Sequence, residues 1–301
     1  MTTPLEPAPP ELAGGRALWL KREDVHELGA FKWRAALPVV ARYRDEGARA
    51  VVTASTGNHG AATAWAASRL GLDAIVFAPL EASRAKLAHL ARLGARVELG
   101  GDDLDEAKES GKAHAREHGL PFFEDGAEPL QYEAYGAIAD EILDQLASPP
   151  GAVVVPVGNG ALLGGVGATL GRRSPSTLRV GAAAKEAPVM ALSFEAGQAV
   201  PCNRCATIAD GLAVRVAVPH AVGVLKNAAD RMLLVSEREI AAGVAALERA
   251  GIRAEAAAGA GLAAVSQLPD VAGPIVAVVT GGNVDDELLT RCRDEPGSFP
   301  A

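Results

Sequence analysis

The most informative stretch of the chain is Leu18–Ala36, which reads LWLKREDVHELGAFKWRAA. Its first residues have the apolar and charged alternation of a strand, and Gly29 interrupts the pattern just before a stretch compatible with a helix. Lys32 therefore lies at a predicted junction between strand and helix, where the floor of an active site is usually built. Most lysines are solvated surface charges, so this stretch alone does not mark Lys32 as catalytic.

Glycine-rich turns follow apolar, β-branched runs at three other places: Thr53–Gly60 (TASTGNHG), Pro156–Gly165 (PVGNGALLGG) and Val278–Asn283 (VVTGGN). Each segment reads as strand, turn and helix. From Ala48 onward, short apolar runs alternate with helical patterns, which predicts parallel sheets built from βαβ units. The first three of these helices are expected to end at glycines that can adopt positive φ, namely Gly71, Gly94 and Gly119.

Together with Lys32, these motifs resemble the fold-type II pyridoxal-phosphate enzymes, most closely the threonine/serine dehydratase and serine racemase branch. The resemblance spans nearly the whole chain. It implies an α/β fold with two doubly wound, mainly parallel-sheet domains and the cofactor in the cleft between them. It places the first part of the large domain at residues 1–47, the small domain at 48–125, and the second part of the large domain at 126–301.

The resemblance also implies roles for individual residues. Lys32 is expected to hold pyridoxal 5'-phosphate covalently and, once displaced by the substrate amine, to remove the α-proton. The phosphate is expected to bind backbone amides at a helix N-terminus, those of Gly158, Asn159, Gly160, Ala161 and Leu162. The family usually has four glycines here, and Asn159 and Ala161 depart from that pattern. A dinucleotide site is the rival, but the spacing is GxGxxxG and no acidic ribose ligand follows.

The remaining site residues come from the other two motifs. Ser55 is expected to face the substrate carboxylate and Asn58 the ring hydroxyl, although a helix N-cap would explain the same turn. His59 is expected to pack or orient rather than to react. Thr280 is expected to offer its hydroxyl to the pyridine nitrogen, with a strand-end hydroxyl bonded to local backbone as the alternative. Because a neutral hydroxyl supports a carbanion less than a carboxylate would, this choice favours β-elimination.

Composition limits the partners. The net charge is -8 and the pI about 5.4, without a basic stripe, so nucleic acid is not expected. The N-terminus lacks the pattern of a signal peptide and no apolar run is long enough to span a bilayer, which predicts a cytoplasmic protein. The Cys202/Cys205 pair and the HxxEH pattern at 114–118 lack further metal ligands, so neither predicts a zinc site.

The predicted function is dehydration of a small β-hydroxy amino acid such as threonine or serine to a 2-oxo acid and ammonia. A racemase or a β-replacement synthase stays open, since Thr56 stands where the racemases have a serine and AYGA at 134–137 replaces the branch's GQGT. A non-catalytic ligand-binding protein would not need Lys32.

Ala183 stands where relatives carry a metal-binding glutamate and Glu186 is offset, so no metal is expected. A homodimer is usual in the family, and a chain ending soon after VTGGN predicts no feedback control by isoleucine.

Overall fold

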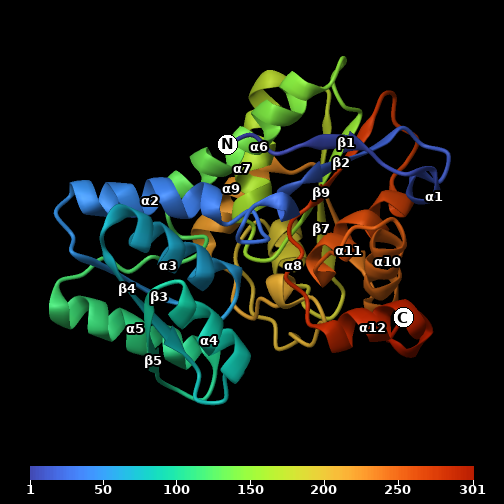
Figure 1. Cartoon of the computed structure of the whole chain (residues 1–301). Coiled ribbons are helices and arrows are strands. Elements are labelled where there is room, and N and C mark those ends of the chain that lie inside the picture. Colours follow the sequence, from blue (N-terminus) through green and yellow to red (C-terminus); the bar gives the residue numbers. More distant parts are fainter. The chain divides into compact units, whose positions relative to one another are not determined.

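The computed structural model describes all 301 residues, and the chain forms two compact units whose elements are labelled in Figure 1. Unit 1 comprises Met1–Phe31 and Tyr135–Ala301, and unit 2 comprises Lys32–Ala134. Both are built from helices around parallel strands, which confirms the predicted α/β fold class. Unit 2 begins before residue 48 because helix α2 (Trp33–Asp45) packs on α3 (Asn58–Leu70). Helix α6 (Pro129–Gln145) begins in unit 2 and continues in unit 1.

Unit 1 contains a six-stranded sheet in the order β1-β2-β9-β6-β7-β8. Its strands are β1 (Leu5–Pro7), β2 (Leu18–Arg22), β6 (Ala152–Pro156), β7 (Leu178–Ala184), β8 (Arg231–Val235) and β9 (Ile275–Val279). Only β1 is antiparallel to its neighbour. The central strands β6 (AVVVP) and β9 (IVAVV) are buried at every position, because strands covered on both faces take apolar, β-branched residues throughout.

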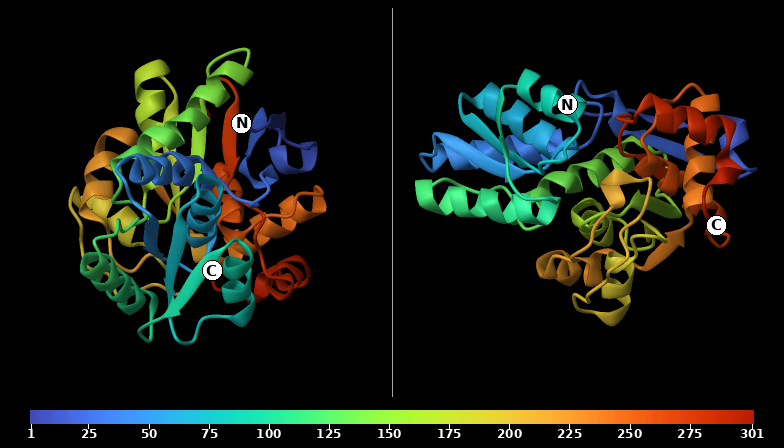
Figure 2. Two further views of the ribbon diagram at one scale, coloured as in Figure 1. Left: turned by 60° about the vertical axis from the view of Figure 1, so that its left-hand side comes forward. Right: turned by 90° about the horizontal axis from the view of Figure 1, so that it is seen from below.

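Helices cover the large sheet on both faces. On one face α10 and α11 pack together and share a core with Leu20, Val154 and Ala277 of the sheet. Helices α7 and α9 pack on each other, and α7 also contacts β6 and β7; both helices can be followed by colour in Figure 2. In addition to α6, unit 1 has the helices α1 (Pro10–Ala13), α7 (Ala161–Arg173), α8 (Val189–Ala196), α9 (Pro219–Ala228), α10 (Glu237–Arg249), α11 (Ala256–Ala264) and α12 (Asp286–Asp294). Short 3-10 turns lie at Glu23–Val25, Asp210–Leu212, Val265–Gln267 and Pro296–Ser298. No helix is long and apolar enough to cross a membrane.

Unit 2 has a parallel three-stranded sheet of β3 (Ala50–Ala54), β4 (Asp73–Ala78) and β5 (Ala95–Leu99). Three helices connect or follow these strands: α3, α4 (Arg84–Arg92) and α5 (Leu104–His118). Gly71 and Gly119 cap α3 and α5 in the left-handed conformation, as the sequence predicts, whereas Gly94 lies one residue beyond the Leu93 cap of α4. Downstream, the 121–123 segment pairs with the free edge of β3: Phe123 N donates to Val52 O at 2.7 Å.

A buried ion pair joins strand β2 to helix α6 in unit 1. The Lys21 side chain is fully buried, and its Nζ donates to Glu141 Oε2 at 2.5 Å and to Thr3 O at 2.7 Å. Thr3 in turn donates its hydroxyl to the buried Glu23. The polar groups of this cluster compensate one another, and removing one charge leaves the other in a medium that solvates it poorly.

We predict that Glu141→Gln lowers the free energy of unfolding by about 3–5 kcal/mol, because it leaves the Lys21 ammonium buried without its counter-ion. The matched control is Asp144→Asn on the same helix, which removes an exposed pair with Arg173 and should change the free energy of unfolding far less, because water screens this pair. Urea unfolding of the three proteins measures both changes. Equal effects of the two substitutions would contradict the prediction.

Candidate active site

A tight turn leads into Lys32. Gly29 has a φ of +62°, and a Cβ at this position would come within 2.6 Å of Asn283 Oδ1. Asn283 Nδ2 donates to Leu28 O at 2.8 Å, and Phe31 N donates to Thr280 O at 3.1 Å. Only glycine fits this conformation and this approach. The glycine-rich loop after β9 thus fixes the backbone of unit 1 up to Phe31, the residue before Lys32.

Lys32 stands at the N-cap of α2 in unit 2, and its side chain is 14% exposed. Its Nζ donates to Asp125 Oδ2 at 2.6 Å. The other Asp125 oxygen accepts a hydrogen bond from Gln131 Nε2 at 2.9 Å, while Gln131 Oε1 accepts from Gly126 N. Burial alone would raise the pKa of Asp125, but the charge of Lys32 and the hydrogen bonds from Lys32 and Gln131 outweigh it and hold this pKa well below its usual range.

Sequence reasoning missed Asp125. The signal that could have indicated it is the acidic pair Glu124-Asp125 after the short apolar run Phe122–Phe123, which pairs with β3 as a strand does. Acidic residues at the carboxyl ends of parallel strands are candidates for function. The run is too short to be recognised as a strand from the sequence.

His59 is buried beside this pair. Its Nε2 lies 3.1 Å from Phe123 O, and its Nδ1 lies 3.8 Å from Asp125 Oδ1. Burial lowers the pKa of His59, so the ring is neutral near pH 7. Because a carbonyl only accepts, the ring proton sits on Nε2. The ring is held by Phe123, whose aromatic ring also packs edge-on against it, which agrees with an orienting role.

The turn between β3 and α3 leaves backbone donors open. Gly57 is the N-cap of α3 and no side chain caps the helix, so the capping alternative for this turn is wrong. Ser55 Oγ instead accepts a hydrogen bond from Gly57 N at 3.2 Å. The amides of His59 and Gly60 have no protein acceptor, since the first backbone bond runs from Ala61 to Gly57. Thr56 and Asn58 lie in the same turn and are partly exposed.

The loop after β6 in unit 1 is the predicted phosphate site. Gly160 is the N-cap of α7, and the amides of Gly160, Leu162 and Leu163 have no protein acceptor. Asn159 Oδ1 accepts from Ala161 N at 3.0 Å, so this one amide of the loop is already bonded to a side chain. Open amides at the start of a 13-residue helix suit a phosphate dianion. The residues present therefore fit the phosphate of pyridoxal phosphate.

Thr280 lies at the carboxyl end of β9 and is 2% exposed. Its Oγ1 donates to Glu255 Oε1 at 2.7 Å, and Glu255 N donates to Gly281 O. The hydroxyl thus bonds a side chain rather than local backbone. Because its hydrogen is already donated to Glu255, the Thr280 hydroxyl can only accept a hydrogen bond from a further partner. Sequence analysis expected a donor at Thr280. No role was predicted for Glu255 from the sequence.

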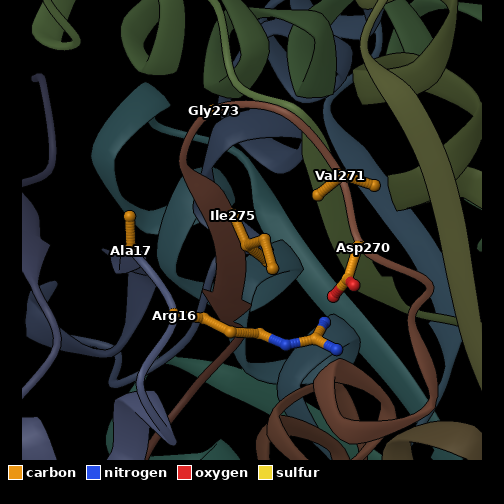
Figure 3. A pocket seen from close by; sticks show the side chains of 6 residues that line it. All are labelled: Arg16, Ala17, Asp270, Val271, Gly273 and Ile275. Carbon is orange, nitrogen blue, oxygen red and sulfur yellow. The ribbon is translucent and has the colours of Figure 1, made fainter.

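A separate pocket in unit 1 is lined by Arg16, Ala17, Asp270, Val271, Gly273 and Ile275 (Figure 3). Ile275 begins β9, so this pocket lies at the amino end of that strand, whereas Thr280 follows its carboxyl end. Parallel sheets bind ligands beyond their carboxyl ends. The Arg16 guanidinium is already bonded to the carbonyl oxygens of Val265 and Leu268. The pocket is therefore no candidate for the active site.

No group of three or more His, Cys, Asp or Glu side chains is arranged to hold a metal ion. The Glu186 carboxylate, the nearest alternative to Ala183 in the sequence alignment, lies 3.9 Å from Arg204 Nε. None of the three cysteines forms a disulfide.

Comparisons with known proteins agree with this geometry. Residues 1–281 match the family described as "Pyridoxal-phosphate dependent enzyme". The chain is 35% identical to the L-threonine ammonia-lyase of Thermotoga maritima over 93% of its own length and 70% of the relative's. It is 33% identical to that of Geobacter sulfurreducens, covering 92% and 69%. Among solved structures, threonine deaminase isoform 2 from Solanum lycopersicum has a TM-score of 0.91 at 28% identity, covering 99% and 89%. Maize serine racemase has a TM-score of 0.88 at 26% identity, covering 96% and 90%.

We predict that Gly158→Ala weakens pyridoxal phosphate binding at least about tenfold, or roughly 1.4 kcal/mol. A Cβ at Gly158 would collide with the carbonyl oxygen of Gly211, so the loop has to move away from its present course. The control is Gly223→Ala on α9, where a Cβ meets nothing within 4 Å. Fluorescence titration of the cofactor-free proteins measures the affinities, and equal dissociation constants for both variants would contradict the assignment of this loop.

Proposed function

The chain belongs to the pyridoxal-phosphate dependent enzymes, and from this premise we propose that it is an ammonia-lyase that dehydrates a small β-hydroxy amino acid. One observation carries the proposal. Lys32 is shielded at a helix start and paired with a carboxylate, so it is not an ordinary surface charge. The relatives named as threonine ammonia-lyases support threonine as the substrate.

We propose residues of this chain for each of the cofactor's requirements. Bound pyridoxal phosphate supplies an electron sink for the substrate's α-carbon. Lys32 of unit 2 is proposed to hold it covalently. The Gly158–Leu162 loop of unit 1 is proposed to bind the phosphate through its open amides. Thr280 is proposed to meet the ring nitrogen, and Asn58 the ring hydroxyl.

Substrate binding is proposed to use the start of α3. The free amides of His59 and Gly60 point out of a helix N-terminus that no side chain caps, which favours an anion such as the α-carboxylate. Ser55 adds a hydroxyl at the same turn. A Cβ at Gly60 would collide with the carbonyl oxygen of Ser55, so the tight turn that presents these amides depends on glycine there.

In the reaction we assign the proton transfers to Lys32. Its neutral amine takes the α-proton, after which the β-hydroxyl leaves as water. The released enamine then hydrolyses to the 2-oxo acid and ammonia. Thr280 offers a hydroxyl rather than a carboxylate, and this hydroxyl already donates its hydrogen bond to Glu255. We propose that this weaker support for a long-lived carbanion gives elimination the advantage over reprotonation.

The proposal extends to the assembly and the location that the family resemblance implies, a cytoplasmic homodimer. Light scattering of the purified protein measures the oligomer. A mass of about 31 kDa would contradict the dimer, since one chain has a mass of 30.8 kDa.

We predict that Lys32→Ala abolishes release of 2-oxo acid from threonine and serine, by about a thousandfold or more, because the base and the covalent anchor are lost together. The exposed Lys226→Ala on α9 is the control and should keep full turnover. A coupled assay for 2-oxo acid measures both. Near-normal activity of the Lys32 variant would rule out the assignment.

We further predict that elimination exceeds racemisation, and that Thr56→Ala removes the remaining racemisation while most 2-oxo acid formation persists. Racemisation needs an acid on the face opposite Lys32, and Thr56 is the candidate beside Gly57-Asn58. Its β-branched side chain restricts the direction of the hydroxyl. Chiral chromatography run beside the 2-oxo acid assay separates the two reactions. Enantiomer exchange faster than ammonia release would make the protein a racemase.

A further inference from the structure

Asp125 has no part in the function proposed so far, yet it is bonded directly to the reactive amine. Its Oδ2 lies 2.6 Å from Lys32 Nζ, with 24% of the Asp125 side chain and 14% of the Lys32 side chain exposed. The bond spans 93 residues of sequence. The carboxylate is therefore brought to the lysine by the fold, through the pairing of residues 121–123 with β3.

The Asp125 carboxylate is also held rigidly. The fully buried Gln131 donates to its Oδ1 at 2.9 Å, and Gln131 is itself fixed by the amide of Gly126. The hydroxyl of Tyr132 donates to Gly126 O at 2.6 Å, which closes the same turn. A supported carboxylate with one oxygen occupied presents the other oxygen in a single direction, toward Lys32.

The charges around Asp125 can be assigned one by one. His59 is neutral because burial lowers its pKa, and burial raises the pKa of Tyr132, so that group is neutral as well. The neighbouring Glu124 forms ion pairs with two other lysines, since its oxygens lie 2.5 Å from Lys108 Nζ and 3.1 Å from Lys112 Nζ. Lys32 is therefore the cation that balances Asp125.

We propose that Asp125 is the positioning residue for Lys32: it holds the ε-nitrogen in place and balances its positive charge in every state of the reaction in which that nitrogen carries one. The inference rests on the proposed function for the identity of the reaction. It concerns a contact that exists in the protein without the cofactor.

The proton balance gives the carboxylate a defined task. When the Lys32 amine takes the α-proton, a C–H bond breaks, an N–H bond forms, and the electron pair stays with the substrate and its cofactor. The resulting ammonium is stabilised by Asp125 until it gives the proton to the β-hydroxyl, whereupon the C–O bond breaks and water leaves. Asp125 stays an anion throughout and transfers no proton itself. An ion pair of this kind is strongest where water is partly excluded, as it is here.

The test compares Asp125→Asn, which keeps the shape and removes the charge, with Asp125→Glu, which restores the charge. The control is Glu128→Gln, three residues along the same segment, because Glu128 pairs with Arg42 rather than Lys32. Each holoprotein is assayed for kcat and KM with serine or threonine. Each is also titrated with pH while the visible absorption band of the lysine-bound cofactor is followed, and melting temperatures verify folding.

We expect Asp125→Asn to lower kcat about ten- to a hundredfold with little change in KM. Its absorption band should change form at a pH lower by about one unit or more, because an anion within hydrogen-bond distance favours the charged form of its partner. Asp125→Glu should recover more than half of the shift in the band, and Glu128→Gln should match the unaltered protein in kcat and in the band.

An unmoved band in Asp125→Asn overturns the inference, even where kcat falls, because a merely structural role would not change the titration. Failure of the proposed function has a different signature. A wild-type protein that carries the cofactor on Lys32 and releases no 2-oxo acid contradicts the dehydratase, while the band titration of the same variants still decides the role of Asp125.

Discussion

The backbone bonds between the Leu28–Phe31 turn and the loop after β9 are the constraint on which the site depends. Strands β2 and β9 are parallel neighbours in the sheet, so the segments that follow them leave the sheet side by side at the carboxyl ends of the strands. The turn then bonds the loop at Thr280 and Gly282. Gly29 is the residue that allows this, because its positive φ and its lack of a side chain let Asn283 approach. These bonds fix the backbone up to Phe31, the residue before Lys32.

Two lysines of the chain illustrate how the same ion-pair chemistry serves two purposes. Lys21 is fully buried and bonded by Glu141 and Thr3, so it is shut off from any ligand and can only affect stability. Lys32 pairs with Asp125 at a similar distance but keeps 14% of its side chain exposed. A partly exposed amine with a fixed counter-ion can react with a ligand and return to its partner. Exposure, not pairing, separates the reactive lysine from the structural one.

The sequence was sufficient for most of the fold because its signals were local. Apolar runs such as AVVVP and IVAVV indicated buried strands, and the glycine turn after AVVVP placed the start of α7. Lys32 was found because a glycine preceded it. Asp125 and the partner of Thr280 were not found, since each depends on a pairing across the fold: Asp125 on the 121–123 segment beside β3, and Glu255 on its approach to Thr280. Residues that are distant in sequence carry no spacing signal.

The central claim is that Lys32 is the residue that holds pyridoxal phosphate. The most direct measurement is to reduce the purified holoprotein with sodium borohydride, digest it, and locate the modified lysine by tandem mass spectrometry. We expect bleaching of the visible band and a stable pyridoxyl group on the peptide that contains Lys32, in about one copy per chain. A pyridoxyl group on any other lysine, or a protein that takes up the cofactor without forming a reducible bond, would contradict it.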